Sequence, residues 1–295
     1  MENSEKQILD DLAAARNYYA SGKFPQAITI YSRLAELLKD DKENLAVIQI
    51  ELGWSYYQNQ DYPLVIECLQ KAHQGGTLDK QQEFDCYRLS GFSLELLGKR
   101  KEALEQLKKA VGTEVPETVK RFSYFELGKI LFTDGQLMEA QQYLKLAQAL
   151  FNEQEKSYQT ALEYYLGFIH FFQKEYPAAR KNFDQVVQYS DDHKTKASGY
   201  FGMAHLYYQQ KDFPVLIDIC EKILRLDEAF YDKETLGYFL CESYLHLKNL
   251  DNLENFFNEL KGQYPQGRYL QEYHKFAEAL KHRQVPEKGK DGMRE

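Results

Sequence analysis

The chain has 295 residues and a formal net charge of −8. This acidic balance argues against generic binding to nucleic acid or to an anionic membrane, because both require a basic surface. No apolar run reaches the length of a membrane span, and the N-terminus lacks a basic region followed by an apolar stretch. We therefore expect a cytoplasmic protein without membrane insertion.

A pattern of small, bulky and small residues recurs seven times, in segments that begin near residues 8, 46, 84, 121, 160, 197 and 234. The first small residue of each pattern follows the previous one after 37 to 39 positions. Such a period is typical of stacked repeats, in which each unit packs on its neighbours and no domain boundary is needed. These small residues are Ala15, Gly53, Gly91, Gly128, Gly167, Ala204 and Cys241.

Each segment is predicted to form two helices joined by a tight turn. Gly22, Gly98 and Gly135 are expected to close the first helix in a left-handed conformation. Four segments continue with an aromatic residue and proline, which suits the first turn of a second helix. Glycine inside a helix costs about 1 kcal/mol relative to alanine, so the recurring glycines indicate close helix contact. The facing residues are expected to be Val65, Ala103, Ala140 and Ala179.

The order of small residue, tyrosine or leucine, glycine, aromatic, alanine, aromatic and small residue resembles the tetratricopeptide repeat (TPR) family over about residues 8–266, with Pro265 ending the last unit. The resemblance implies an all-α, right-handed superhelical solenoid of about seven helix-turn-helix repeats. The period exceeds the usual 34 residues. The extra residues fall in polar stretches between repeats, where longer second helices or longer connectors are expected.

The C-terminal region is predicted to cap the solenoid. Tyr269, Tyr273, Phe276 and Leu280 follow helical spacing, which indicates a capping helix over 268–283. We expect residues 1–283 to form a single solenoid. Residues 284–295 are polar and contain proline and glycine, so we expect them to be disordered.

The sequence offers no pattern that indicates catalysis, a cofactor or a metal site. It lacks phosphate-loop, dinucleotide-binding, nucleophile-elbow and metalloprotease motifs, and its seven histidines lack ligand spacing. His170 is interpreted as a hydrogen-bonded packing residue, whereas His205 and His246 are expected to face the surface. The cysteines are scattered and are interpreted as small buried residues. They are Cys68, Cys86, Cys220 and Cys241.

In the TPR architecture the first helices line a concave groove, so the resemblance predicts which side chains face a ligand. Most of these positions are aromatic here. Periodicity alone does not separate groove-facing aromatics from those packed between helices, and both readings stay open. The predicted groove residues are Arg16, Tyr19, Trp54, Tyr57, Arg88, Phe92, Phe125, Lys129, Phe132, Tyr164, Phe168, Phe171, Phe201, His205, Tyr208 and Tyr238.

The groove chemistry favours a protein or peptide partner with an apolar or aromatic segment. Chaperone-binding members of the family clamp a carboxylate with lysine, asparagine and arginine, whereas this chain has Leu12, Arg16, Glu51, Asp85 and Leu89 at those places. We therefore predict a non-enzymatic interaction scaffold without such a clamp. The alternatives are a peptide-responsive regulator of the bacterial TPR type and an enzyme built on a solenoid.

Overall fold

A computed structural model describes residues 2–75 and 78–283, and these residues form helices without any β-strand. The chain divides into two compact units, Met1–Asn152 and Glu153–Glu295. Within each unit every helix packs against the next one in the chain. The predicted all-α solenoid of helix pairs is therefore confirmed.

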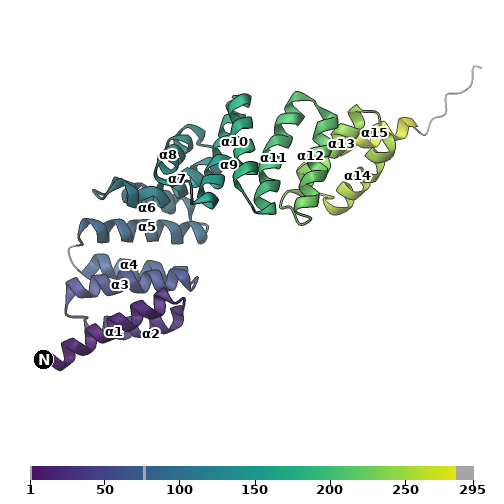
Figure 1. Ribbon diagram of the computed structural model, residues 1–295. Coiled ribbons are helices and arrows are strands. Elements are labelled where there is room, and N and C mark those ends of the chain that lie inside the picture. The colour runs from purple at the N-terminus through teal and green to yellow at the C-terminus, as the bar shows by residue number, and fades with distance from the viewer. Residues whose placement is uncertain (1, 76–77, 284–295) are drawn as a thin grey trace, which may run out of the picture. The chain divides into compact units, whose positions relative to one another are not determined.

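The first unit contains four helix pairs and a short 3-10 turn in its described residues (Figure 1). In chain order these are α1 (Glu2–Ala20), α2 (Phe24–Leu37), α3 (Lys42–Gln58), α4 (Tyr62–Gly75), α5 (Lys80–Leu96), α6 (Arg100–Gly112), η1 (Glu117–Lys120), α7 (Arg121–Thr133) and α8 (Leu137–Leu150).

The second unit contains three helix pairs and a final helix in its described residues (Figure 1). In chain order these are α9 (Lys156–Phe172), α10 (Tyr176–Tyr189), α11 (His193–Gln210), α12 (Phe213–Leu226), α13 (Lys233–His246), α14 (Leu250–Gln263) and α15 (Tyr273–Arg283).

The turn inside each pair contains one residue in the left-handed conformation. Three of these residues are the glycines predicted from the sequence, Gly22, Gly98 and Gly135. The other four, which have side chains, are Gln60, Lys174, Lys211 and Lys248. All seven follow the spacing of the repeat, so the turn geometry is set by the repeat even where glycine is missing.

The extra residues of the long period extend several first helices, whereas before α7, which has only 13 residues, they lengthen the connector, as expected, and include the η1 turn. Helices α3, α5 and α9 have 17 residues, whereas their partners α4, α6 and α10 have 14, 13 and 14. The polar stretches contain N-caps that start these longer helices early. Asp41 accepts a hydrogen bond from the Asn44 amide, and Asp192 accepts one from the Thr195 amide.

The recurring glycines lie at helix contacts, but their neighbours differ from those expected. A Cβ atom at Gly128 would lie 2.5 Å from Leu144 Cγ, and one at Gly91 would lie 2.5 Å from Leu107 Cγ. The contact therefore falls one helical turn beyond Ala103 and Ala140. The missing Cβ makes room for a large side chain of the second helix and for the close approach of its backbone, because a Cβ at Gly128 would also lie 3.2 Å from the Leu144 amide nitrogen.

The last helix is shorter than the predicted 268–283, because α15 begins at Tyr273. The preceding residues, 268–272, form turns. Helix α15 contacts α14 and α13, and Phe276 is fully buried against them, as a capping element requires. The predicted disordered tail, 284–295, lies outside the described residues.

Two further predictions about side chains can be compared with the structure. His170 Nδ1 lies 2.8 Å from Asn182 Oδ1, which confirms a hydrogen-bonded packing role. The four cysteines are buried, and none forms a disulfide. Among the described helices, none is both long and apolar enough to cross a membrane.

Candidate functional site

Four residues of the predicted groove line one pocket in the first unit. Arg16 and Tyr19 come from α1, Trp54 from α3 and Arg88 from α5, because the repeat places equivalent positions of successive first helices side by side. The pocket has a volume of about 410 Å³. Tyr31 of α2 and Glu51 of α3 complete its lining.

Aromatic rings form much of this pocket's wall. The Arg88 guanidinium lies 4.9 Å from the Trp54 ring centre and 5.0 Å from that of Phe84. Trp54 packs edge to face against Tyr57 at 5.9 Å, and Tyr57 lies 6.5 Å from Phe92. Stacking holds the flat guanidinium in place while Trp54 stays only partly buried.

Each cation predicted for the groove of this unit has a carboxylate partner. Arg16 pairs with Glu51 at 2.5 Å, Arg88 with Asp85 at 2.7 Å, and Lys129 with Glu126 at 2.6 Å. Burial and the hydrogen bond with Glu51 raise the pKa of Tyr31. The pocket therefore contains charges that are already neutralised.

The other predicted groove residues of the first unit differ in accessibility. Phe92, Lys129 and Phe132 are half-buried. Phe125 is buried, with 8% of its surface exposed. Burial also raises the pKa of Glu126, despite its pairing with Lys129. Phe125 therefore contributes mainly to packing between the helices.

In the second unit, the predicted groove residues form a continuous aromatic cluster. Phe168 lies 5.0 Å from Phe183 and 5.5 Å from His205, and Phe201 lies 4.7 Å from His205. Phe171 also packs against His205, at 5.7 Å. Phe168 and Phe201 are buried, whereas Tyr164, Phe171 and Tyr208 are half-buried.

His205 does not face the surface as expected. It is surrounded by rings from α9, α11 and α13, including Phe239 at 5.1 Å. Burial lowers the pKa of His205 to about 4, although the Asp232 carboxylate acts in the opposite direction. The imidazole is therefore neutral at neutral pH and serves as part of the aromatic packing.

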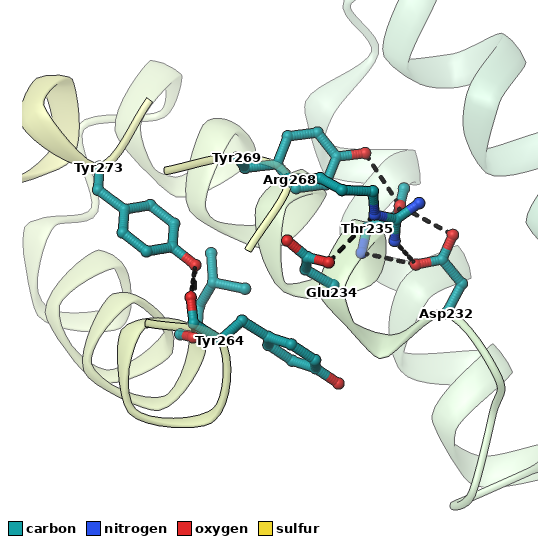
Figure 2. Close-up of polar contacts among 8 residues, drawn as sticks. Asp232, Glu234, Thr235, Tyr264, Arg268, Tyr269 and Tyr273 are labelled. Carbon is teal, nitrogen blue, oxygen red and sulfur yellow. Dashed lines mark hydrogen bonds and ion pairs between the residues drawn. The ribbon is translucent and has the colours of Figure 1, made fainter. Parts of the chain in front are cut away.

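The chain itself covers the predicted groove residue of the last repeat. Tyr269 stacks on Tyr238 with ring centres 4.1 Å apart. The Tyr269 hydroxyl lies 2.9 Å from Thr235 Oγ1 (Figure 2). Arg268 forms ion pairs with Asp232 and Glu234 beside it (Figure 2). Tyr238 is consequently buried.

The sequence did not place Tyr31, Tyr231 or Tyr269 beside the groove residues, because the groove prediction covers only the first helix of each pair, and Tyr269 is assigned to the capping helix. Tyr31 lies on a second helix, and the other two precede the first turn of α13 and α15. A spacing of 38 residues between Tyr231 and Tyr269 is the signal that links these two. No group of three or more His, Cys, Asp or Glu side chains in residues 2–75 and 78–283 is arranged to hold a metal ion.

Comparisons with known proteins identify the fold. No family model matches the chain, and no curated protein matches it. The C-terminal part of a TPR repeat-containing protein from Cytophaga hutchinsonii has 17% identity and a TM-score of 0.61, covering 91% of this chain and 99% of that one. The apo form of RapI has 14% identity and a TM-score of 0.65, covering 92% and 80%.

A third similar structure is YrrB, described as a TPR protein with an unusual peptide-binding site. It has 18% identity and a TM-score of 0.51, and the match covers 71% of this chain and 95% of that one. The helix pairs and their left-handed turns define an α-helical repeat protein. More specifically, the fold is that of the tetratricopeptide repeat proteins, which confirms the resemblance seen in the sequence.

Proposed function

We propose that this protein is a non-enzymatic interaction scaffold that acts in the cytoplasm. It binds an apolar or aromatic-rich segment of a partner protein on its concave face. The main support is the pocket of the first unit, where Arg16, Tyr19, Trp54 and Arg88 come together as the repeat register predicts. Partly exposed aromatic side chains of this kind are the usual anchors of protein interfaces.

The paired charges support an apolar ligand over an acidic one. A carboxylate clamp requires cations that are available to the ligand. Here the two arginines are held by Glu51 and Asp85, whose side chains are less than a quarter exposed. A ligand carboxylate would meet these two carboxylates as a like charge, which weakens the binding of an acidic ligand at a partly buried site.

The likeness to YrrB gives independent support for peptide binding, since a peptide-binding site is named for that protein. The likeness to RapI concerns the fold alone.

Selection from a random peptide library displayed on phage tests this proposal. The full chain is immobilised, and peptides that also bind the Trp54→Ala variant are removed. We expect the enriched peptides to contain aromatic or large aliphatic residues. Synthetic versions should change the Trp54 fluorescence, because Trp54 is the only tryptophan and lines the pocket.

Leu146→Ala on α8 provides a matched control, since Leu146 is exposed and does not line the pocket. It should bind the selected peptides as the unchanged protein does. Enrichment of acidic C-termini, or the absence of any peptide that binds the unchanged protein better than the Trp54→Ala variant, would contradict the proposal.

A further inference from the structure

In the second unit, three successive first helices present an aromatic ring at the same register. Tyr164 lies on α9, Phe201 on α11 and Tyr238 on α13, each 37 residues from the next. The repeat therefore builds the same concave position three times. What lies against each of these rings differs from repeat to repeat.

The chain itself places a tyrosine against two of the three rings. Tyr269 stacks on Tyr238 with an interplanar angle of 2°. The Tyr269 hydroxyl lies against Thr235 (Figure 2). Tyr231 packs edge to face on Phe201 at 5.8 Å, beside the buried Phe230, whose ring centre lies 5.2 Å from that of Phe201. Both tyrosines belong to the segment that precedes the next first helix. The fold thus brings a tyrosine from that segment to this register position twice.

The equivalent segment before α11 supplies no such ring to Tyr164. This segment, Ser190–Asp192, contains no aromatic residue, and the residue 37 positions before Tyr231 is Lys194, in the first turn of α11. A pocket of about 440 Å³ lies at this place. Its lining includes Ser157, Ala161, Tyr164, Lys194, Ser198 and Tyr231.

The pocket has the features needed to hold a phenol. Tyr164 and Tyr231 provide ring surfaces. Their hydroxyls are 2.7 Å apart, so a tyrosine hydroxyl can form a hydrogen bond at the rim of this pocket. Tyr231 is 64% exposed, because only part of its ring packs on Phe201. Serine hydroxyls from α9 and α11 add further partners for a buried tyrosine hydroxyl.

We propose that this pocket binds a tyrosine side chain from the partner's segment, in the position that Tyr231 and Tyr269 occupy in the next two repeats. The inference rests on the proposed function, because it assigns a partner's side chain to the groove register of the second unit. It adds a specific requirement to that function: a tyrosine anchor in the second unit.

Titration of the full chain with N-acetyl-tyrosinamide, followed by NMR, tests the inference. We expect saturable shifts of the Ala161 and Ser198 signals, with a Kd in the millimolar range that is usual for a single side chain. N-acetyl-leucinamide should bind at least about fivefold more weakly. The Trp54 indole signal, in the first unit, should not move.

Two variants fill the pocket in different ways. Ala161→Phe places a ring inside it and should weaken probe binding at least about tenfold, whereas Gln188→Phe, on an exposed position of α10, should leave binding unchanged. Lys194→Tyr introduces a tyrosine 37 residues before Tyr231, where the other two repeats have one near their groove ring. It should also block the probe, and it should raise the Tm by about 2 °C through the added packing.

The inference is overturned if the probe gives no saturable shift at Ala161, if the leucine analogue binds equally well, or if Ala161→Phe and Lys194→Tyr both bind normally. These results would leave the peptide selection at Trp54 unaffected. Failure of the tyrosine anchor is therefore distinguishable from failure of the proposed function.

Discussion

At the scale of single residues, the concave register includes both accessible and buried aromatic side chains. Trp54 and Phe132 keep part of their surface in solvent, whereas Phe168 is 7% exposed and packs on Phe183 and His205. The difference follows from the neighbours. Phe168 has rings on both sides along the helix stack, so its side chain contributes to the core of the second unit.

Replacement of Phe168 by alanine is therefore expected to cost about 3–5 kcal/mol of unfolding free energy, as for a buried phenylalanine. Phe132→Ala should cost less, because that side chain is only half-buried. Urea denaturation of both variants provides the measurement. Equal, small losses would show that Phe168 is an accessible groove residue.

His205 should make stability depend on pH. Its folded pKa is about 4, below the unfolded value of about 6.5, so the unfolded chain binds more protons between these values. The contribution of neutral His205 to the free energy of unfolding is complete above about pH 6.5 and is lost as the pH falls toward 4. Between pH 7.5 and 5 we expect a loss of about 2 kcal/mol from this group.

The His205→Leu variant keeps an apolar side chain at this place and removes the titration. Urea midpoints of both proteins at the two pH values test the expectation. The unchanged protein should lose more stability on acidification than the variant, and parallel losses would show that His205 is accessible to solvent.

At the scale of helices, the repeat glycines differ in how tightly they are packed. A Cβ atom at Gly128 would lie 2.5 Å from Leu144 Cγ and 3.2 Å from the Leu144 amide nitrogen. At Gly53 the nearest atoms would be 3.4 Å or more away. The same residue type thus has a packing role in one helix pair and only a weak one in another.

Gly128→Ala should destabilise the protein by about 1–3 kcal/mol, because overpacking outweighs the gain in helix propensity. Gly53→Ala is the matched control and should be neutral or stabilising by up to about 1 kcal/mol. Thermal unfolding of the two variants separates these outcomes. A stabilised Gly128→Ala protein would contradict the close contact with Leu144.

The left-handed turns allow a second comparison between helix pairs. Lys211 has a φ of 59°, a conformation that costs a residue with a side chain roughly 1–2 kcal/mol. Lys211→Gly should therefore stabilise the protein by about 0.5–1 kcal/mol, after the greater freedom of unfolded glycine is counted.

Gly135→Ala, where no atom lies within 4 Å of the new Cβ, should destabilise the protein by about 1 kcal/mol through strain alone. Chemical denaturation measures both, and effects of the opposite sign would rule out a left-handed turn.

At the scale of the whole molecule, the division into two compact units predicts local responses to mutation. In a solenoid each repeat contacts only its neighbours, so stability is distributed along the chain. In the Phe168→Ala variant we expect faster hydrogen exchange in α9–α12 than in the unchanged protein, with little change in α3–α5. Hydrogen exchange followed by mass spectrometry provides the measurement. Uniform acceleration across the chain would indicate a single cooperative unit.

Much of the architecture could be predicted from the sequence. The recurring small residues, the aromatic-proline pairs and Gly22, Gly98 and Gly135 locate the helix pairs, because helical spacing and turn chemistry are local properties. The register also identified Arg16, Tyr19, Trp54 and Arg88, which line one pocket. The length of the first helices was missed, because the capping role of Asp41 and Asp192 was not considered.

The sequence by itself determined the repeat, the helix pairs and the positions that share a concave register. Only the tertiary structure decided which of those positions are covered. Tyr238 is covered by Tyr269, and Phe201 by Phe230 and Tyr231, in each case from about thirty positions further along the chain, whereas Tyr164 lies beside a pocket. The physical reason is that side-chain exposure depends on the volume filled by neighbouring repeats, and the period of one helix does not contain that information.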